Sequence, residues 1–277
     1  VYNQSLCGCL YRRSDFEMKR TYFFNLLKMK MLSIRLIISV FCMVFMNFLV
    51  VMPDIRANYD TLDIVYLFRF TYDIGSFSRL LPLLAAFVMA DAVAQDFCDH
   101  TMPFLLARMD DKTYINCNYI VCAVSGFVTI AAGWGAFVLL LHIRYPFLAA
   151  GSDNLENFIL QPFGQWLQNK NPCVYIASYI FSSALCGSLW SCVGLAVSAF
   201  YPDRKVALAS PFIINILLYN IAYISTGPWH SPSDVAKYIS QANDAMTFLC
   251  MAGYFVLLHV VVHRIFRFKM RWRFIHA

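Results

Sequence analysis

Long segments without a charged residue dominate the pattern of apolar and polar positions along this chain. Asp, Glu, Lys and Arg are all missing from residues 36–53, 113–143, 171–202, 206–233 and 245–263. A hydrocarbon layer about 30 Å thick is crossed by roughly 20 apolar residues in a helix. A surface helix of a water-soluble protein would carry a polar face, which these segments lack. The pattern predicts an all-α protein that crosses a membrane several times.

Six membrane-spanning helices are predicted, because a weaker apolar stretch around residues 80–94 joins the five uncharged segments. The predicted bounds are Met31–Val51, Ser76–Ala94, Tyr114–Leu141, Val174–Tyr201, Val206–Ile224 and Ala245–His263. Pro82 and Pro211 each remove a backbone donor inside a span and predict kinks. A charge at membrane depth costs about 2.5–3.5 kcal/mol, so Asp91 is expected to snorkel to the nearby interface or pair with a basic neighbour.

Composition supports the same class of protein. Hydrophobic residues make up 60% of the chain and charged residues 14%, against about 25% charged residues in an average soluble domain. A water-soluble shape with so little charge would expose large apolar patches and aggregate. A transmembrane domain is therefore expected at residues 31–263, between an amino-terminal segment 1–30 and a basic tail 264–277.

The basic residues gather on one side of the predicted spans. Of the 22 Lys and Arg residues, six belong to the other side, which leaves 22 − 6 = 16 for the termini and the two loops that share their side. The six are Arg56, Arg69, Arg79, Arg144, Lys170 and Lys237. Short basic loops stay in the cytosol, so both termini are predicted to be cytosolic. The net charge of +6 is explained by this asymmetry, and no nucleic-acid partner is expected.

Two segments are predicted to lie at the inner membrane interface. Residues 16–30 mix apolar and basic positions, as in an amphipathic helix resting on anionic headgroups; a cytosolic extension of the first span is the alternative. The tail alternates cations with rings, which nucleic-acid-binding segments also do, but directly after a span this pattern indicates snorkelling arginines and an anchoring Trp. The predicted anchors to membrane lipids are Lys28, Lys30, Arg264, Arg267, Arg271 and Trp272.

Two short helices are predicted on the outer side. Residues 155–167 place aromatic and apolar side chains at helical spacing, with Pro162 able to break the element, which suits a helix resting on the outer leaflet. A second helix is expected after residues 231–234, where Ser or Asp can cap it. Ordinary loop packing is the alternative for both.

Familiar catalytic and metal-binding motifs are absent from the sequence. No glycine is followed by Lys, so there is no phosphate-binding G-x-x-x-x-G-K-[ST] loop, and neither H-E-x-x-H nor G-x-S-x-G occurs. The pair Cys7 and Cys9 lacks a second ligand pair at zinc spacing. We therefore predict no catalytic, cofactor-binding or metal-binding residues in this chain.

One acidic cluster keeps an enzymatic alternative open. Asp91, Asp96, Asp99, Asp110 and Asp111 surround one predicted cytosolic loop, and paired carboxylates can bind Mg²⁺ in membrane enzymes that act on lipid or prenyl diphosphates. Such enzymes usually carry a second acidic set, whereas here the other cytosolic loop has a single acid. A solvated loop that meets a protein partner is the favoured interpretation.

The order of elements and residues 87–126 together resemble the permease subunit of an ABC-2 type ATP-binding cassette exporter. In that family an acidic end of the second span leads to a Thr, an apolar turn and an Arg, and a basic residue and a Tyr then open a long third span. The matching residues are Asp96, Asp99, Thr101, Leu105, Leu106, Arg108, Lys112 and Tyr114. His100 and Asn118 depart from the pattern, where family members often carry Gly and Lys.

The resemblance implies a multi-pass protein of a bacterial plasma membrane that exports an amphiphilic peptide, lipid or drug. Two copies of a separate ATPase subunit, which would bind ATP and Mg²⁺, and a second or homologous permease copy are the implied partners. The implied coupling loop that docks on the ATPase comprises Asp96, Phe97, Asp99, Thr101, Leu105, Arg108, Met109, Asp111 and Lys112.

The residues of this loop suit such an interface in their own right. Phe97, Thr101, Leu105 and Met109 are four apart, which would form an apolar stripe rimmed by charge. Pro103 predicts two short turns in place of one straight helix. A secondary carrier that needs no ATP is a further alternative, but neither an inverted repeat nor a pair of charges at mid-membrane supports it.

Overall fold

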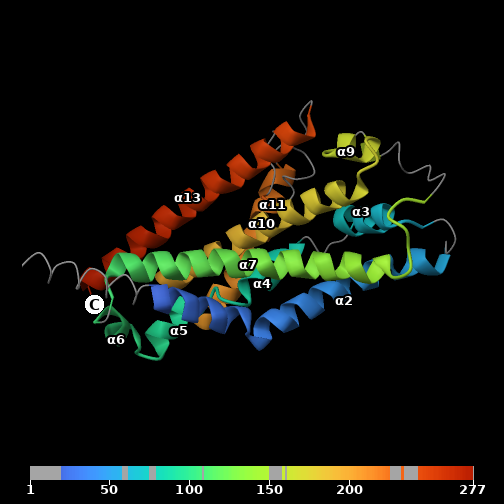
Figure 1. Cartoon of the computed structure of the whole chain (residues 1–277). Coiled ribbons are helices and arrows are strands. Elements are labelled where there is room, and N and C mark those ends of the chain that lie inside the picture. The colour runs from blue at the N-terminus through green and yellow to red at the C-terminus, as the bar shows by residue number, and fades with distance from the viewer. Residues whose placement is uncertain are drawn as a thin grey trace, which may run out of the picture.

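The computed structural model describes residues 20–57, 62–74, 79–107, 109–149, 158–159, 161–224, 232–233 and 243–276, and in these residues it contains helices and no strand. The long helices are α2 (Ile34–Ala57), α7 (Asp111–His142), α10 (Pro172–Phe200), α11 (Arg204–Ile224) and α13 (Asp244–His276). The short helices are α3 (Ile64–Ile74), α4 (Leu81–Ala86), α5 (Ala92–Cys98), α6 (Met102–Leu106) and α9 (Gly164–Gln168). Figure 1 shows α5 and α6 beside the C-terminus at one end of an elongated bundle, with α3 and α9 toward the other.

Four described helices are long and apolar enough to cross a membrane: Ile34–Ala57, Asp111–His142, Pro172–Phe200 and Asp244–Ile275. Their outer faces carry large apolar side chains, of which Phe41 on α2 is 68% exposed and Leu249 on α13 is 64% exposed. Water would penalise such surfaces, whereas lipid chains would not. The predicted all-α class is therefore confirmed for the described residues, and these four helices, in place of the six predicted spans, indicate a membrane protein.

The predicted span Ser76–Ala94 is wrong as a continuous helix. In its described part, residues 79–94, the α-helical segments are α4 and the start of α5, and residues 87–91 form turns between them. The amide of Ala92 donates to the carbonyl of Met89 at 3.0 Å, the tight spacing of a 3₁₀ turn. Ala85, Val88 and Ala90 are fully buried, so this segment lies inside the protein, where neighbouring helices can surround an irregular backbone.

The break in this segment contains a buried charge. Asp91 is 1% exposed, and its two carboxylate oxygens accept hydrogen bonds from the guanidinium of Arg35 at 2.9 and 3.0 Å. Arg35 lies in the first turn of α2, so the ion pair joins the broken segment to the first long helix. The predicted pairing of Asp91 with a basic neighbour is confirmed.

Small residues set the crossings of the long helices. A Cβ atom at Gly126 of α7 would lie 2.7 Å from the Cβ of Ser191 and 2.8 Å from the carbonyl oxygen of Gly187, both on α10. A Cβ atom at Gly194 would lie 2.7 Å from the Cβ of Ala90. Helix association in lipid depends on such close contact, because apolar side chains are equally well solvated by lipid.

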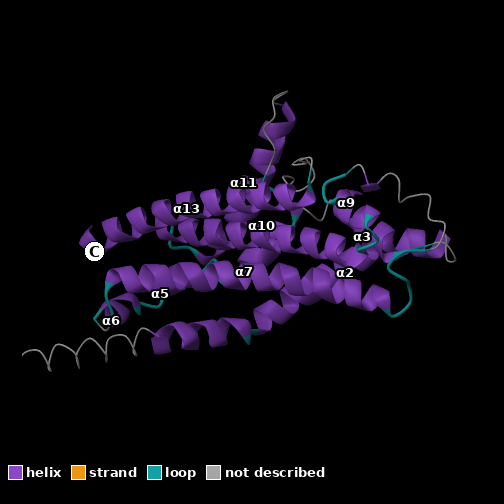
Figure 2. Cartoon of the chain, turned by 45° about the horizontal axis from the view of Figure 1, so that its top comes forward, coloured by secondary structure: helices purple, strands orange, loops and turns teal. Residues whose placement is uncertain are grey.

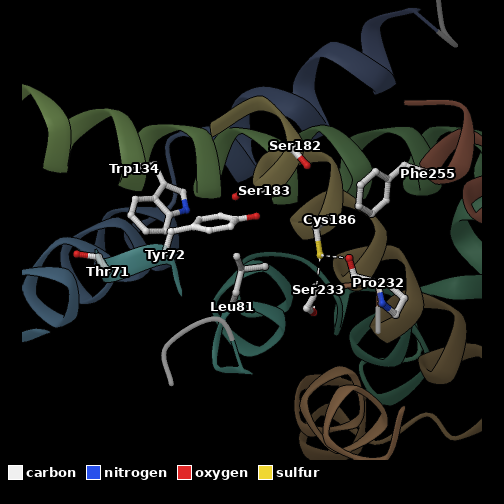
Figure 3. Close-up of a pocket in the computed structure, with 10 residues that line it drawn as sticks. All are labelled: Thr71, Tyr72, Leu81, Trp134, Ser182, Ser183, Cys186, Pro232, Ser233 and Phe255. Carbon is white, nitrogen blue, oxygen red and sulfur yellow. Dashed lines mark hydrogen bonds between the residues drawn. The ribbon is translucent and has the colours of Figure 1, made fainter. Parts of the chain in front are cut away.

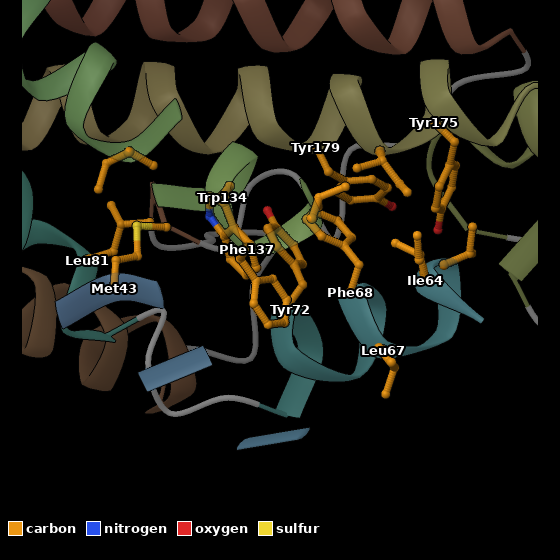
Figure 4. Close-up of a cluster of buried hydrophobic side chains, with 14 of the residues drawn as sticks. Met43, Ile64, Leu67, Phe68, Tyr72, Leu81, Trp134, Phe137, Tyr175 and Tyr179 are labelled. Atoms are coloured by element: carbon orange, nitrogen blue, oxygen red, sulfur yellow. The ribbon is translucent and has the colours of Figure 1, made fainter. Parts of the chain in front are cut away.

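An aromatic cluster fills the α3–α9 end of the bundle (Figure 4). Phe68 and Tyr72 of α3 lie against Trp134 of α7 and Tyr179 of α10, with ring centroids 4.9 Å apart for Phe68 and Trp134 and 5.1 Å apart for Tyr72 and Tyr179. Edge-on and tilted pairs of this kind add to the stabilisation from burial alone. The cluster holds α3 against the long helices.

The outer segment 155–167 differs from the predicted leaflet helix in where its apolar side chains point. Pro162 does break it, because Phe163 adopts a left-handed conformation with φ of 65° and α9 begins at Gly164. Phe163 and Leu167 are buried in the aromatic core instead of facing a leaflet. The other outer helix, expected after residues 231–234, lies outside the described residues except for 232–233.

Residues 20–31 form the amino-terminal helix, which matches the part of the predicted amphipathic helix that the structure describes. Half-buried positions recur at 22, 23, 26, 27, 30 and 31, while 20, 21, 24, 25, 28 and 29 are exposed. This is the period of an α-helix with one covered face. Figure 2 shows a bend between this helix and α2, where the hydroxyl of Ser33 accepts the amide of Leu36 at 3.4 Å.

Candidate functional site

The predicted coupling loop lies at one end of the bundle, between α5 and the start of α7, beside the C-terminal turns of α13 (Figure 1). We call this region the α5–α6 end. A second apolar cluster supports it from within, formed by residues such as Met102, Tyr114, Ile115 and Phe266. The loop therefore rests on the same helices that form the membrane-spanning candidates.

Two short helices build the loop, as Pro103 predicted. α5 ends at Cys98, His100 reverses the chain with φ of 54°, and α6 begins at Met102 with Pro103 in its first turn. Pro suits this position because the first helical turn leaves its amide groups without helical partners. The backbone amide and the hydroxyl of Thr101 both donate to the carbonyl of Asp96, at 3.1 and 3.2 Å, and close the bend.

Asp96 ties the loop to α7. Its carboxylate accepts a hydrogen bond from the phenol of Tyr114 and a longer one from Thr101 at 3.4 Å. Burial raises the pKa of Asp96 above its ordinary value, and the hydrogen bonds from Tyr114 and Thr101 act in the opposite direction. The predicted site residue Asp96 therefore faces the protein interior, and its acceptor capacity is used within the chain.

Asp99 and Phe97 tie the loop to α11 and α13. Asp99 forms an ion pair with Arg204 at 2.6 Å, at the start of α11. The guanidinium of Arg273 lies 4.9 Å from the centre of the Phe97 ring and donates to the carbonyl of Phe200 at 2.8 Å. Side-chain contacts therefore connect the loop to α7, α11 and α13.

The outward surface of the loop differs from the predicted apolar stripe. Phe97, Leu105 and Met109 are half-buried against the inner cluster, whereas Thr101 is exposed. The largest exposed apolar side chain is Phe104, at 73% exposure. Phe104 was not among the predicted loop residues. The available signal is its position directly after Pro103, which places the ring in the first turn of a short surface helix.

A groove of about 610 Å³ adjoins the loop. Met109, Asp111 and Lys112 line it together with Arg271 and Ile275 of α13. The structure therefore brings together three residues of the predicted coupling loop and one of the predicted lipid anchors. Arg108, the remaining predicted loop residue, lies outside the described residues.

The predicted interface anchors occupy the same end of the bundle. Lys28 is exposed and Lys30 is half-buried on the amino-terminal helix, and burial lowers the pKa of Lys30 while nearby Asp91 opposes this shift. On α13, Trp272 is 47% exposed and the ammonium of Lys269 lies 4.0 Å from the centre of its ring. Arg264 is exposed, and Arg267 and Arg271 are half-buried.

The aspartates of the predicted acidic cluster do not converge. Asp91 pairs with Arg35, Asp96 bonds to Tyr114, and Asp99 pairs with Arg204, each in a different direction. Across the described ranges, no group of three His, Cys, Asp or Glu residues is placed to hold a metal ion. A magnesium site would need at least a shared position for these carboxylates.

A small cavity with a mainly apolar lining lies inside the bundle (Figure 3). Its volume of about 20 Å³ suits one buried water, and the indole nitrogen of Trp134 and the hydroxyl of Ser183 have no protein partner among the described residues. Residues 232–233 reach this region: the hydroxyl of Ser233 accepts from the indole of Trp190 at 3.1 Å and donates to Asn215 at 2.8 Å. The entry of residues 232–233 into the bundle was not predicted from the sequence.

Comparison with known proteins does not identify this chain. No known protein family matches the sequence, and no characterised protein matches it either. The arrangement of the α5–α6 end therefore carries the functional argument.

Proposed function

We propose that this chain is the membrane permease subunit of an ATP-driven exporter of the ABC-2 type, working with separate ATPase subunits. In this proposal α2, α7, α10, α11 and α13 cross the membrane, and the buried α4–α5 segment completes a six-span topology. Both termini and the α5–α6 end would face the cytosol of a bacterial cell. ATP and Mg²⁺ would bind to the ATPase partner.

The observation that carries the proposal is a compact two-helix loop that is fixed to several spans and exposes an apolar anchor. Phe104 points outward at 73% exposure, and the adjacent groove offers Asp111, Lys112 and Arg271 for charge pairing. A central aromatic side chain with a charged rim is the usual composition of a protein-binding surface. The resemblance of residues 96–114 to a coupling loop agrees with this position.

Mechanical coupling follows from the contacts of the loop. A displacement of α5 and α6 by the ATPase would act on α7 through Asp96 and Tyr114, and on α11 through Asp99 and Arg204. Arg273 would carry the same displacement to α13 through Phe97. Packed helices move as rigid bodies, so these three connections would change the access of the bundle together. The chain needs no catalytic residue of its own for this role.

The test is copurification of ATP hydrolysis with the tagged chain from its native membranes. Phe104→Ala is expected to reduce the copurifying ATPase activity at least tenfold, because an interface anchor is lost. Phe24→Ala is the matched control, since this ring is 53% exposed on the amino-terminal helix and lies outside the loop; its activity should stay within twofold. Charge reversal of Arg108 and Asp111 together should also weaken the association.

Two outcomes would contradict the proposal. Equal ATPase recovery with Phe104→Ala and the wild-type chain would remove the docking role of the loop. Mg²⁺-dependent turnover of a lipid or prenyl diphosphate by the purified chain alone would establish the enzymatic alternative instead.

A further inference from the structure

A groove of about 730 Å³ runs along the side of the bundle between α7 and α13. It is separate from the α5–α6 loop, and Ser188 of α10 forms part of its floor. Figure 2 shows α7, α10 and α13 running side by side. Both walls belong to helices that are long and apolar enough to cross a membrane, so the groove opens toward lipid.

The two walls change from apolar to basic along their length. α7 and α13 are antiparallel, and the imidazole of His263 lies 3.1 Å from the side-chain oxygen of Asn116. Eight residues separate Asn116 from Val124, about 12 Å along a helix. Val124 and Val256 therefore line one end of the groove, and Arg267, one turn beyond His263, lines the other.

Two cations at the basic end of the groove lack an anionic partner among the described residues. Arg264 and Arg267 both line the groove, and neither forms an ion pair with a carboxylate in the part of the chain that the structure describes. Arg267 is half-buried, which weakens its contact with water. A guanidinium in that position favours a phosphate, because its planar N–H groups match two phosphate oxygens.

We propose that this groove binds one anionic phospholipid. The phosphate lies against Arg264 and Arg267, and an acyl chain follows the apolar walls between Val124 and Val256. The volume is within the range of 300–1,000 Å³ that is usual for small-molecule sites. A second copy of the chain fits less well, since an apolar helix would bury both arginines without a counter-charge. This inference does not depend on the proposed export function.

The two arginines also predict which lipid the groove should prefer. Each basic residue near a membrane surface favours an anionic lipid by about fivefold. Because the two factors multiply, two arginines should favour phosphatidylglycerol over phosphatidylcholine of the same chain length by about 25-fold. Tyr119, whose phenol donates to the backbone carbonyl of His259 at 2.8 Å, lines the groove between its basic and apolar ends.

Native mass spectrometry of the purified chain, released from mild detergent after addition of a defined lipid, tests the proposal. The wild-type chain should retain one phosphatidylglycerol with about 25-fold preference over phosphatidylcholine. Val256→Trp fills the groove and should weaken this retention at least tenfold. Leu257→Trp is the matched control, since residues 256 and 257 are adjacent and 61% and 62% exposed, but Leu257 does not line the groove; retention should stay within twofold.

The charge is tested separately. Arg267→Gln should lower the retention of phosphatidylglycerol about fivefold and that of phosphatidylcholine less, because choline already balances the charge of its phosphate. Lys205→Gln is the control, since this exposed cation at the start of α11 lies outside the groove and should change neither. Val260→Phe, with Val261→Phe as its control, replaces the tryptophan pair if Val256→Trp is not monodisperse in gel filtration.

Three results would overturn the proposal. The first is equal retention of phosphatidylglycerol by the groove-filling variant and its control. The second is equal retention of the anionic and the zwitterionic lipid by the wild-type chain. The third is full displacement by glycerol phosphate at matched concentration, because a site for a free soluble anion would not need the apolar walls.

Discussion

Replacement of Arg35 by Gln should expose how much the fold depends on one buried ion pair. Asp91 is 1% exposed and interrupts the helical path between α4 and α5, and Arg35 binds both of its oxygens. Gln at position 35 keeps a hydrogen-bond donor but removes the positive charge. The carboxylate would then be buried without its counter-charge.

The magnitude follows from the environment of both partners. Breaking a buried ion pair usually costs about 3–5 kcal/mol, and an acidic residue at the centre of a span costs about 2.5–3.5 kcal/mol. Arg35 is 36% exposed, so water already weakens the pair, and the positive charge of Lys30 also acts on Asp91. We therefore expect a loss of about 2–3 kcal/mol in the free energy of unfolding, or about 30- to 160-fold in the folded-to-unfolded ratio.

Equilibrium unfolding in mixed micelles of mild detergent and dodecyl sulfate, followed by tryptophan fluorescence, measures this loss. Arg204→Gln is the control, because its ion pair with Asp99 is exposed, at 42% and 45%, and should contribute less than about 1 kcal/mol. The double variant Arg35→Gln with Asp91→Asn removes the stranded charge. It should recover about 1–2 kcal/mol relative to Arg35→Gln alone.

A loss of stability in Arg35→Gln no larger than that in Arg204→Gln would show that the buried ion pair is not needed for the fold. A double variant as unstable as Arg35→Gln alone would also contradict this prediction. The loss of free energy of unfolding would then come from lost packing and not from an uncompensated carboxylate.

Two further predictions concern the helix crossings and the topology. Gly126→Ala should lower the free energy of unfolding by about 1–3 kcal/mol, since the new methyl group would overlap Ser191. Gly135→Ala, on the same helix with no atom within 4 Å of its Cβ, should change it by less than about 0.5 kcal/mol. For the topology, a membrane-impermeant maleimide should label exposed Cys173 in intact cells and reach exposed Cys98 only after permeabilisation; the opposite pattern would reverse the proposed orientation.

The long helices were predictable because charge marks their ends. The predicted span Tyr114–Leu141 corresponds to α7, Asp111–His142, and Val174–Tyr201 corresponds to α10, Pro172–Phe200. An uncharged apolar segment has few stable conformations in lipid besides a helix. The errors at the ends of these two helices are one to three residues, since capping depends on neighbours that periodicity does not describe. The errors are larger elsewhere: α2 ends at Ala57 instead of the predicted Val51, and α13 continues to His276 instead of ending at the predicted His263.

The interior of the second predicted span was not predictable to the same degree. Arg79 and Asp91 mark the segment as unusual, and the pairing of Asp91 follows from the cost of burying a charge. Its partner, Arg35, is 56 residues away, and only the packing of α2 against the segment selects it. Hydropathy also cannot separate a continuous helix from a broken one when both are equally buried.

The candidate site was likewise predictable only in part. Pro103 was sufficient to predict two short helices, because its ring cannot continue a helix from α5. The contacts that fix them were not predictable, since Tyr114, Arg204 and Arg273 come from three different helices. Residues four apart in sequence lie on one face only if the helix is continuous, which explains why Phe104 is exposed while Phe97 and Met109 are half-buried.

One signal for helix packing was present but becomes meaningful only with the fold. Gly126 and Gly133 on α7 are seven residues apart, and so are Gly187 and Gly194 on α10. Seven residues are close to two helical turns, so each pair lies on one face. Gly126 meets Gly187, whereas Gly133 receives Met43 of α2 and Gly194 receives Ala90. α7 and α10 therefore each use one small-residue face for two different neighbours, which lets the two most central helices hold α2 on one side and the broken segment on the other.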